Sequence, residues 1–280
     1  MTRIGFVVHD RRPEAGTLAA DLERFLVAAG HTVRTAGAVG AGVDHTFVDG
    51  LDLVVSLGGD GTMLRSVELV AGAGVPILGV NLGQLGYLTE VEPDAAAGAL
   101  QRVLDGDYTV HHRMLLDVSV VRAGASEPDP ALRVLALNEA VLERAGSGHT
   151  VRLDVRIDGS VFTPYEADAL IVATPTGSTA YAFSARGPII APDHDALLLT
   201  PVSPHMLFDR SLVLGPASVV ELEVTGGRKA TLTVDGRIHA GLLDGDVVRC
   251  TAATERAQLI RLGPRDFHRI LKLKFGLRDR

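Results

Sequence analysis

The sequence has little of several residue types that define common classes of protein. It contains one cysteine, Cys250, and no tryptophan. A single cysteine excludes a disulfide framework within the chain and a cysteine-based zinc site. No apolar run approaches the roughly 18 residues that a membrane-spanning helix needs, and no signal-peptide pattern precedes the strand-like residues 4–8. Together these absences predict a cytoplasmic protein.

Lysine is also scarce, with three lysines against 24 arginines, and the net charge is −7. An acidic chain lacks the basic footprint that binding to nucleic acid or to an anionic membrane requires. None of the lysines follows a glycine-rich loop in the pattern GK[ST]. The sequence therefore predicts neither kind of partner, and any phosphate site cannot be of the Walker type.

What is present is typical of a globular enzyme of one large or two modest domains: 280 residues, 46% hydrophobic and 22% charged. In the first part, apolar strands alternate with helical patterns, which predicts an α/β domain with a parallel sheet. The expected strands are 4–8, 31–35, 51–57 and 75–80, and the expected helices are 16–29, 62–71 and 94–104.

After residue 106 the pattern changes to two-residue alternation, which predicts an antiparallel β domain resembling a sandwich. The expected strands are 115–121, 132–137, 151–157, 219–224 and 230–234. Residues 266–275 again have helical spacing and are expected to pack on the first domain. The predicted domains are therefore 1–105, 106–263 and a C-terminal helical segment, 264–280.

The most informative stretch is Gly58-Gly59-Asp60-Gly61-Thr62, which follows an apolar strand and precedes a helix. Glycines let main-chain N–H groups approach a phosphate, and a helix N-terminus adds donors and a favourable dipole. The alternative is a sharp turn in which Asp60 only caps the helix. Three glycines around one carboxylate favour the phosphate site.

Three constellations downstream also carry polar groups to strand ends. The pair Asn138-Glu139 interrupts an apolar strand and has the groups to bind vicinal hydroxyls, although a solvated strand face explains Glu139 equally well. Residues 174–181, TPTGSTAY, offer four serine and threonine hydroxyls after an apolar strand, with Asp168 just before that strand; helix capping needs only one hydroxyl. The glycines of NLGQLGYLTE, at 81–90, are better explained as turn glycines.

Together these segments resemble the NAD kinase family, in order and over nearly the whole chain. The segments that carry the resemblance are GGDGT (58–62), NLGQLGYLT (81–89), Asn138-Glu139, TPTGSTAY (174–181), SARGP (184–188), TPVSPHMLFDR (200–210) and Asp235-Gly236. The first motif alone is shared with lipid kinases and phosphofructokinases. The combination of TPTGSTAY with the Asn-Glu pair is far more specific.

The resemblance implies transfer of the γ-phosphoryl of ATP, or a phosphoryl of polyphosphate, to the 2′-hydroxyl of the adenosine ribose of NAD, which gives NADP. It also implies a divalent cation, Mg²⁺ or Mn²⁺, that is not tightly bound, and a homodimer or homotetramer. Asp60 would be the general base or the holder of the metal, and no dedicated metal ligands are predicted. The residues expected to contact the nucleotides are Gly58, Gly59, Gly61, Thr62, Arg65, Asn81, Asn138, Glu139, His149, Asp168, Thr179, Ala180, Tyr181, Ser184 and Arg237.

Three departures from the family pattern stand out. Arg186 occupies the position of a second glycine, Ser211 replaces a proline, and Ala167-Asp168-Ala169 replaces the usual GDG. Arg186 is expected to alter donor preference or packing between subunits. Two other functions remain open at this point: a kinase that uses the GGDGT device on a lipid or sugar phosphate, and a non-catalytic regulator that binds a dinucleotide.

Overall fold

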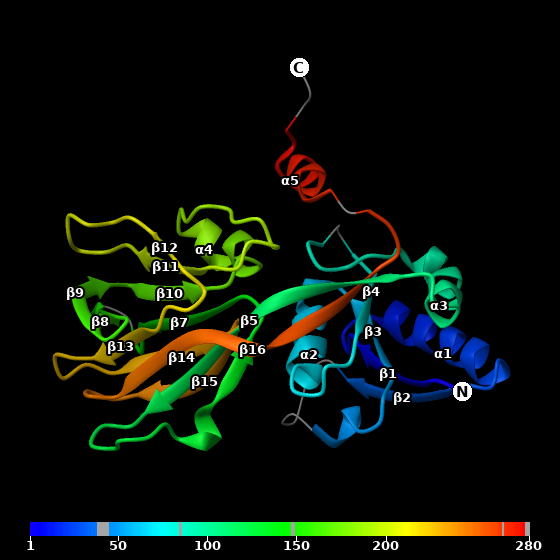
Figure 1. The fold of residues 1–280 in the computed structure, drawn as a ribbon, viewed down its shortest axis with the longest axis horizontal. Coiled ribbons are helices and arrows are strands. Elements are labelled where there is room, and N and C mark those ends of the chain that lie inside the picture. The colour runs from blue at the N-terminus through cyan, green and yellow to red at the C-terminus, as the bar shows by residue number, and fades with distance from the viewer. Residues whose placement is uncertain (38–44, 84–85, 147–148, 265, 278–280) are drawn as a thin grey trace. The chain divides into compact units, whose positions relative to one another are not determined.

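The structure is a computed structural model that describes residues 1–37, 45–83, 86–146, 149–264 and 266–277 (Figure 1). The chain forms two compact units. Unit 1 comprises Met1–His112 with Ala257–Arg280, and unit 2 comprises Arg113–Arg256. Among the described residues, no helix is long and apolar enough to cross a membrane.

The centre of unit 1 is a parallel sheet with the strand order β2-β1-β3-β4, to which the end of β16 adds in parallel beside β4. Its strands are β1 (Arg3–Val8), β2 (Thr32–Gly37), β3 (Leu53–Gly58), β4 (Ile77–Asn81) and β16 (Val247–Arg261). Every residue of β3 and β4 is buried. Continuous apolar runs of this kind are expected where helices cover both faces of a parallel sheet.

The helices of unit 1 are α1 (Pro13–Ala28), α2 (Asp60–Val70), α3 (Ala96–Leu104) and α5 (Phe267–Phe275), with short 3-10 turns at His45–Val48 and Pro93–Ala95. Helix α1 starts with Pro13 in its first turn and buries Ala15, Ala19, Leu22 and Leu26, a helical spacing that forms one apolar stripe. This stripe packs with α3 and with strands β1, β3 and β4 in one core cluster.

Unit 2 contains two antiparallel sheets. One has the order β12-β11-β10-β7-β14-β15; in the other, β16 pairs with β13, which continues to β8 and β9, and β5 pairs with β16 and β6. The strands are β5 (Thr109–Val121), β6 (Val134–Ala136), β7 (Glu139–Arg144), β8 (Val151–Ile157), β9 (Ser160–Ala167), β10 (Ala169–Ala173), β11 (Leu197–Val202), β12 (Leu212–Leu214), β13 (Val220–Val224), β14 (Ala230–Val234) and β15 (Arg237–Leu242).

The core of unit 2 lies between these sheets, because one cluster of buried side chains draws from both of them, including Leu142, Leu153, Val172, Leu222 and Leu232. A second cluster covers the outer face of β7, β10 and β11. It joins Ile171 and Leu198 to Ala182 of α4 (Tyr181–Ser184) and to Ile190. The middle of this sheet, at β7, β10 and β11, is therefore buried on both faces.

The predicted fold class is confirmed: an α/β unit, an antiparallel β unit, and a C-terminal helix that belongs to the first unit. Some local predictions need correction. The strand expected at 132–137 begins only at Val134, because Pro130–Leu132 forms a 3-10 turn. Alternation also did not reveal β11, since its residues are buried on both faces. The domain limits 105/106 and 263/264 stay a prediction; the compact units divide within the long strands β5 and β16.

Candidate functional site

The GGDGT segment forms a tight turn from β3 into α2. Gly58 ends the strand, and a Cβ there would lie 2.1 Å from Thr62 Oγ1, so a side chain at this position is excluded. The carbonyl of Gly59 accepts the N–H groups of Thr62 and Met63 at 3.0 and 3.1 Å and starts the helix. A Cβ on Gly59 or Gly61 would meet nothing within 4 Å. Two of the three glycines thus leave open space beside a helix N-terminus, the arrangement expected of a phosphate site.

The carboxylate of Asp60 is held by a second loop. Its Oδ2 accepts the backbone N–H of Tyr87 at 2.9 Å, and its Oδ1 accepts that of Leu88 at 3.0 Å. A Cβ on Gly86 would lie 2.2 Å from Asp60 Oδ1, so this glycine permits the close approach. Each carboxylate oxygen has a further lone pair. Asp60 is therefore fixed in direction and can still accept a hydroxyl proton or bind a cation.

The same loop is fixed from its other end by a buried ion pair. Arg261 Nη1 lies 2.9 Å from Glu90 Oε2 and 3.5 Å from the carbonyl oxygen of Leu88. Burial lowers the pKa of Arg261, and the charge and hydrogen bond of Glu90 oppose that shift. This ion pair ties the loop to the end of β16. Breaking it is unfavourable, because removal of either partner would leave the other charge buried and unpaired.

Arg65 and Asn81 also lie in unit 1, at positions that already have protein partners. Arg65 is buried on α2 and pairs with Glu68 at 2.8 Å. Asn81 ends β4, where its amide donates to the Gly83 carbonyl at 3.0 Å and lies 3.4 Å from Glu92 Oε1. Contact of either side chain with a nucleotide stays a prediction. Gln84 and Leu85 of the NLGQLGYLTE segment lie outside the described residues.

In unit 2, Asn138 and Glu139 lie where β7 begins. Asn138 is partly exposed, whereas Glu139 is only 6% exposed. Burial raises the pKa of Glu139 to about 8; the charge of Asp235 raises it further, and a hydrogen bond from the backbone N–H of Tyr181 opposes the shift. Glu139 Oε2 is buried and finds no hydrogen-bond partner among the described residues. Glu139 is thus not the solvated strand residue that the sequence allowed.

The TPTGSTAY segment leaves β10, forms a 3-10 turn at Gly177–Thr179, and enters α4. Several of its hydroxyls bind the backbone: Thr174 Oγ1 donates to the Leu137 carbonyl at 2.5 Å, and Ser178 Oγ donates to the Pro175 carbonyl at 2.7 Å. Thr179 Oγ1 donates to the Thr176 carbonyl at 3.2 Å. These hydroxyls shape the turn, which explains their number without a ligand for each.

Asp168 and Tyr181 line one hollow in unit 2, beside Glu143 and Arg144. Asp168 Oδ1 lies 3.4 Å from Arg144 Nη1. Burial raises the pKa of Tyr181, and the charges of Glu143, Asp168 and Glu139 raise it further. Through the Tyr181 N–H bond to Glu139, the structure brings Asp168, Tyr181 and the Asn138-Glu139 pair into one region. Ser184, His149 and Arg237 are exposed, and their roles stay predictions.

The departures from the family pattern have local structural consequences. Arg186 is exposed and has a left-handed backbone with φ 65°, a conformation that favours glycine. Ser211 Oγ accepts a hydrogen bond from Thr200 Oγ1 at 3.0 Å, a contact that proline could not make. The neighbouring alanines of Asp168 are both buried.

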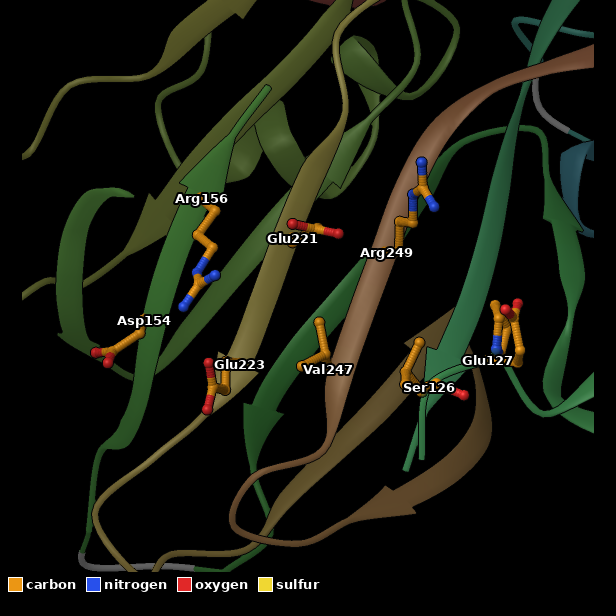
Figure 2. A pocket seen from close by; sticks show the side chains of 10 residues that line it. Ser126, Glu127, Asp154, Arg156, Glu221, Glu223, Val247 and Arg249 are labelled. Atoms are coloured by element: carbon orange, nitrogen blue, oxygen red, sulfur yellow. The ribbon is translucent and has the colours of Figure 1, made fainter. Parts of the chain in front are cut away.

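A second hollow lies on the outer face of the β8-β13-β16 sheet and contains none of the predicted residues (Figure 2). In the strand register, Arg156 faces Glu221, which faces Arg249 on its other side. One step along, Asp154 faces Glu223. This face is a ladder of charged side chains, as is typical of the solvated side of an antiparallel sheet.

Several residues that shape the site carry no distinctive sequence signal. Gly86 and Gly177 permit close approach, and the Tyr87 and Leu88 N–H groups bind Asp60. Asp235 stands in the Asp235-Gly236 segment of the family resemblance, but no role was predicted for it. All of these roles depend on backbone contacts between distant segments, which for Asp60 are 27 and 28 residues apart. The spacing of residues along one sequence does not encode such contacts.

Family profiles match both parts of the chain. The profile described as "ATP-NAD kinase N-terminal domain" covers residues 4–108, and "ATP-NAD kinase C-terminal domain" covers residues 137–262. Among curated proteins, an NAD kinase from Moorella thermoacetica is 41% identical over 99% of this chain and 90% of its own length. An NAD kinase from Heliobacterium modesticaldum is 44% identical over 80% of this chain and 78% of its own length.

Two solved structures share the fold. An NAD kinase from Archaeoglobus fulgidus in complex with ATP has a TM-score of 0.75 and 25% identity, with 98% of each chain covered. The yeast NADH kinase complexed with NADH has a TM-score of 0.90 and 23% identity, covering 100% of this chain and 89% of the other. The second similarity supports the fold alone.

Proposed function

This chain belongs to the ATP-NAD kinase family, and we propose for it the phosphorylation of NAD with the roles described below. The γ-phosphoryl of ATP, or a terminal phosphoryl of polyphosphate, is transferred to the 2′-hydroxyl of the adenosine ribose of NAD. The bond from phosphorus to the donor's bridging oxygen breaks, a bond to the 2′-oxygen forms, and the hydroxyl loses its proton. The products are NADP and ADP, or NADP and a shortened polyphosphate.

The observation that carries the proposal is the turn at Gly58–Thr62. Phosphoryl transfer depends on positioning and on charge stabilisation more than on covalent chemistry. The turn supports both, because open space at Gly59 and Gly61 adjoins the α2 N-terminus and the fixed carboxylate of Asp60. Asp60 accepts the hydroxyl proton as general base or holds a cation; both roles are compatible with its free lone pairs.

A divalent cation fits this site as a companion of the donor phosphates. Mg²⁺ is commonly bound by one or two carboxylates together with substrate phosphates. Among the described residues, no three histidine, cysteine, aspartate or glutamate side chains lie together as a metal cluster, whereas Asp60 provides one carboxylate at the phosphate turn. When bound, Mg²⁺ or Mn²⁺ would neutralise charge on the transferred phosphoryl group.

For the acceptor, we assign the NAD pocket to unit 2. Asn138 and Glu139 would bind ribose hydroxyls, since an amide and a carboxylic acid offer donors and acceptors side by side. Asp168 and Tyr181 line a common hollow and would contact the nucleotide there. The remaining proposed nucleotide contacts are Thr62, Arg65 and Asn81 in unit 1 and His149, Thr179, Ala180, Ser184 and Arg237 in unit 2. We also predict a cytoplasmic location, and the assay below compares NAD with NADH as the acceptor.

The chain is proposed to be a homodimer or homotetramer. The support is a set of exposed apolar side chains in unit 2: Phe162 and Phe208, which are 40% and 37% exposed, and their sequence neighbours Val161 and Leu207, which are 73% and 104% exposed. The two phenylalanine rings are in contact, 5.8 Å between centroids. Exposed apolar surface beside an edge strand is typical of an interface.

The test is NADP formation from NAD with ATP and Mg²⁺, compared between wild type and Asp60→Asn. We expect a loss of about 10²–10⁴-fold in kcat for Asp60→Asn, the usual contribution of a general base. Asp129→Asn is the control, because Asp129 also accepts a backbone N–H at the start of a helical turn, that of Ala131 at 3.0 Å. Parallel reactions with polyphosphate and with NADH identify the donor and the acceptor. Tight NAD binding with no product from any donor would point instead to a dinucleotide-binding regulator.

A further inference from the structure

Asp235 binds three consecutive backbone N–H groups at the start of β7. Its Oδ2 accepts from Leu137 at 2.8 Å, and its Oδ1 accepts from Asn138 at 2.8 Å and from Glu139 at 3.0 Å. Its own N–H donates to the Glu139 carbonyl at 3.0 Å. These residues are separated by 96 to 98 positions in the sequence. A single carboxylate therefore determines the path of the segment that carries the Asn138-Glu139 pair.

The hairpin turn between β14 and β15 presents this carboxylate in a special backbone conformation. Asp235 has φ 46° and Gly236 has φ 77°, the two positive values of a tight turn that favours Asp-Gly. The turn is therefore more than a connection, because its first residue projects its side chain back to another strand of the same sheet. β7 pairs with β14 directly before this turn, with Val234 opposite Ala140.

The TPTGSTAY segment holds the same peptide groups through their carbonyls. Thr174 Oγ1 donates to the Leu137 carbonyl at 2.5 Å, and the Thr174 N–H donates to the Asn138 carbonyl at 2.8 Å. A Cβ on Gly177 would lie 2.1 Å from that Asn138 carbonyl. The backbone N–H groups of residues 137–139 are thus bound by the Asp235 carboxylate, and the carbonyl groups of Leu137 and Asn138 are bound by the turn after β10.

The backbone N–H of Tyr181 lies near the Glu139 side chain, where it opposes the rise in the pKa of the carboxyl. With the backbone of 137–139 bound through both its N–H and C=O groups, the directions in which the Asn138 and Glu139 side chains leave the chain are fixed as well. Groups that bind a ligand act best when their neighbours hold them in the bound geometry beforehand.

We propose that Asp235 is a positioning residue for the acceptor nucleotide: it orients Asn138 and Glu139 by binding their backbone, and it does not itself contact the substrate. The inference rests on the proposed function, in which this pair binds the ribose. It assigns a role in recognition to a hairpin residue far from the pair in sequence. Loss of the carboxylate should weaken acceptor binding before it affects the chemical step.

The test compares Asp235→Ala and Asp235→Asn with wild type in steady-state NADP formation and in calorimetric NAD binding without a donor. Asp235→Ala removes all three acceptor contacts, so we expect its KM and Kd for NAD to rise by about tenfold or more, with a smaller change in kcat. Asp235→Asn keeps one accepting oxygen and should lie between. The KM for ATP should stay within about twofold of wild type, since the positioned residues bind the acceptor.

Asp158 offers a matched control in the same unit. It begins the Asp-Gly turn between β8 and β9 with φ 52°, and its carboxylate accepts the Val219 N–H at 2.8 Å. Asp158→Ala and Asp158→Asn remove fewer and more exposed contacts, so they should lower the melting temperature less than the Asp235 variants do, and they should leave KM for NAD unchanged. Equal kinetic effects of both pairs of variants, or an unchanged KM and Kd in folded Asp235→Asn, would overturn the proposal.

Failure of the proposed function would be distinguishable in the same experiment. If wild type binds NAD but forms no NADP with any donor, the kinase assignment fails, while the calorimetric comparison of Asp235 with Asp158 variants still tests positioning. If wild type forms NADP and the Asp235 variants bind NAD as tightly as wild type does, only the positioning role is wrong. Absence of NAD binding by wild type would overturn both.

Discussion

Glu139 is a carboxylic acid whose buried environment raises its pKa to about 8, well above the unfolded value. Burial is the main cause, and the Asp235 charge adds to it. The folded protein therefore holds a proton on Glu139 that the unfolded chain releases near its ordinary pKa. By linkage, the contribution of Glu139 to stability is greatest at low pH and is lost progressively as the pH rises towards about 8.

Replacement of Glu139 by glutamine, which resembles the protonated acid, should remove this pH dependence. Between pH 5 and pH 8, wild type should lose stability relative to Glu139→Gln by at least about 1.4 kcal/mol, the equivalent of one pKa unit. Urea unfolding of both proteins at the two pH values measures the difference. A constant difference between the two proteins across this range would show that Glu139 is ionised throughout.

Arg186 has a left-handed backbone conformation that is energetically unfavourable for a residue other than glycine. The left-handed conformation costs a non-glycine residue roughly 1–2 kcal/mol, and the entropy of glycine in the unfolded state offsets part of the gain. We expect Arg186→Gly to stabilise the protein by about 0.5–1 kcal/mol, measured by thermal unfolding. Arg186→Ala is the control, because it removes the guanidinium and keeps the strained conformation.

The same two Arg186 variants test whether the guanidinium affects function. If it alters donor preference, both variants should change the ratio of kcat/KM values for ATP and polyphosphate; if it contributes to subunit packing, both should change the assembly. Unchanged ratios and unchanged assembly in both variants would reject these roles and leave only the backbone effect.

At the scale of a secondary-structure element, strand β13 carries two glutamates with opposite surroundings. Glu221 lies between Arg156 and Arg249, whereas Glu223 faces Asp154 (Figure 2). Facing pairs of opposite charge contribute roughly 0.2–1 kcal/mol, and like charges destabilise a sheet. Glu221→Lys should therefore destabilise unit 2, and Glu223→Lys should stabilise it by a few tenths of a kcal/mol to about 1 kcal/mol.

These two substitutions control for each other, since they make the same change on the same face of one strand. Chemical unfolding at low and high salt separates charge effects from packing, because exposed charges are screened by salt. The expected opposite signs should both shrink at high salt. The same sign for both variants would show that the facing pairs do not determine the effect.

At the scale of the whole molecule, the exposed apolar side chains of unit 2 around Phe162 and Phe208 bear on assembly. Sedimentation velocity at micromolar concentration should show a species larger than the 29.5 kDa chain. The double variant Phe162→Ser/Leu207→Ser should shift it towards the monomer, because these side chains are exposed in the single chain. Val27→Ser, at an exposed apolar position on α1 in unit 1, is the control. A monomeric wild type, or an equal shift with Val27→Ser, would contradict the proposal.

Much of the fold was predictable because periodicity reports burial. The alternation of residues 219–224 and 230–234 predicted strands, and β13 and β14 confirm them, each with one covered face. The apolar run before Gly58 predicted a buried parallel strand, as observed in β3. Prediction failed where burial has no period, as in β11, and where a proline turn precedes a strand, as in β6.

The sequence by itself determined the family, the fold class and the presence of the glycine-rich turn around Asp60, because local composition and spacing encode burial, turns and motif order. Only the tertiary structure decided that Asp60 is bound by the Tyr87 and Leu88 N–H groups, that Glu139 is buried and its pKa raised, and that Asp235 holds its backbone. Each of these properties depends on backbone groups brought together from distant segments. Every residue except proline has a main-chain N–H, so the identity of a residue does not tell which side chain its N–H binds. Such contacts are therefore known only from the folded chain.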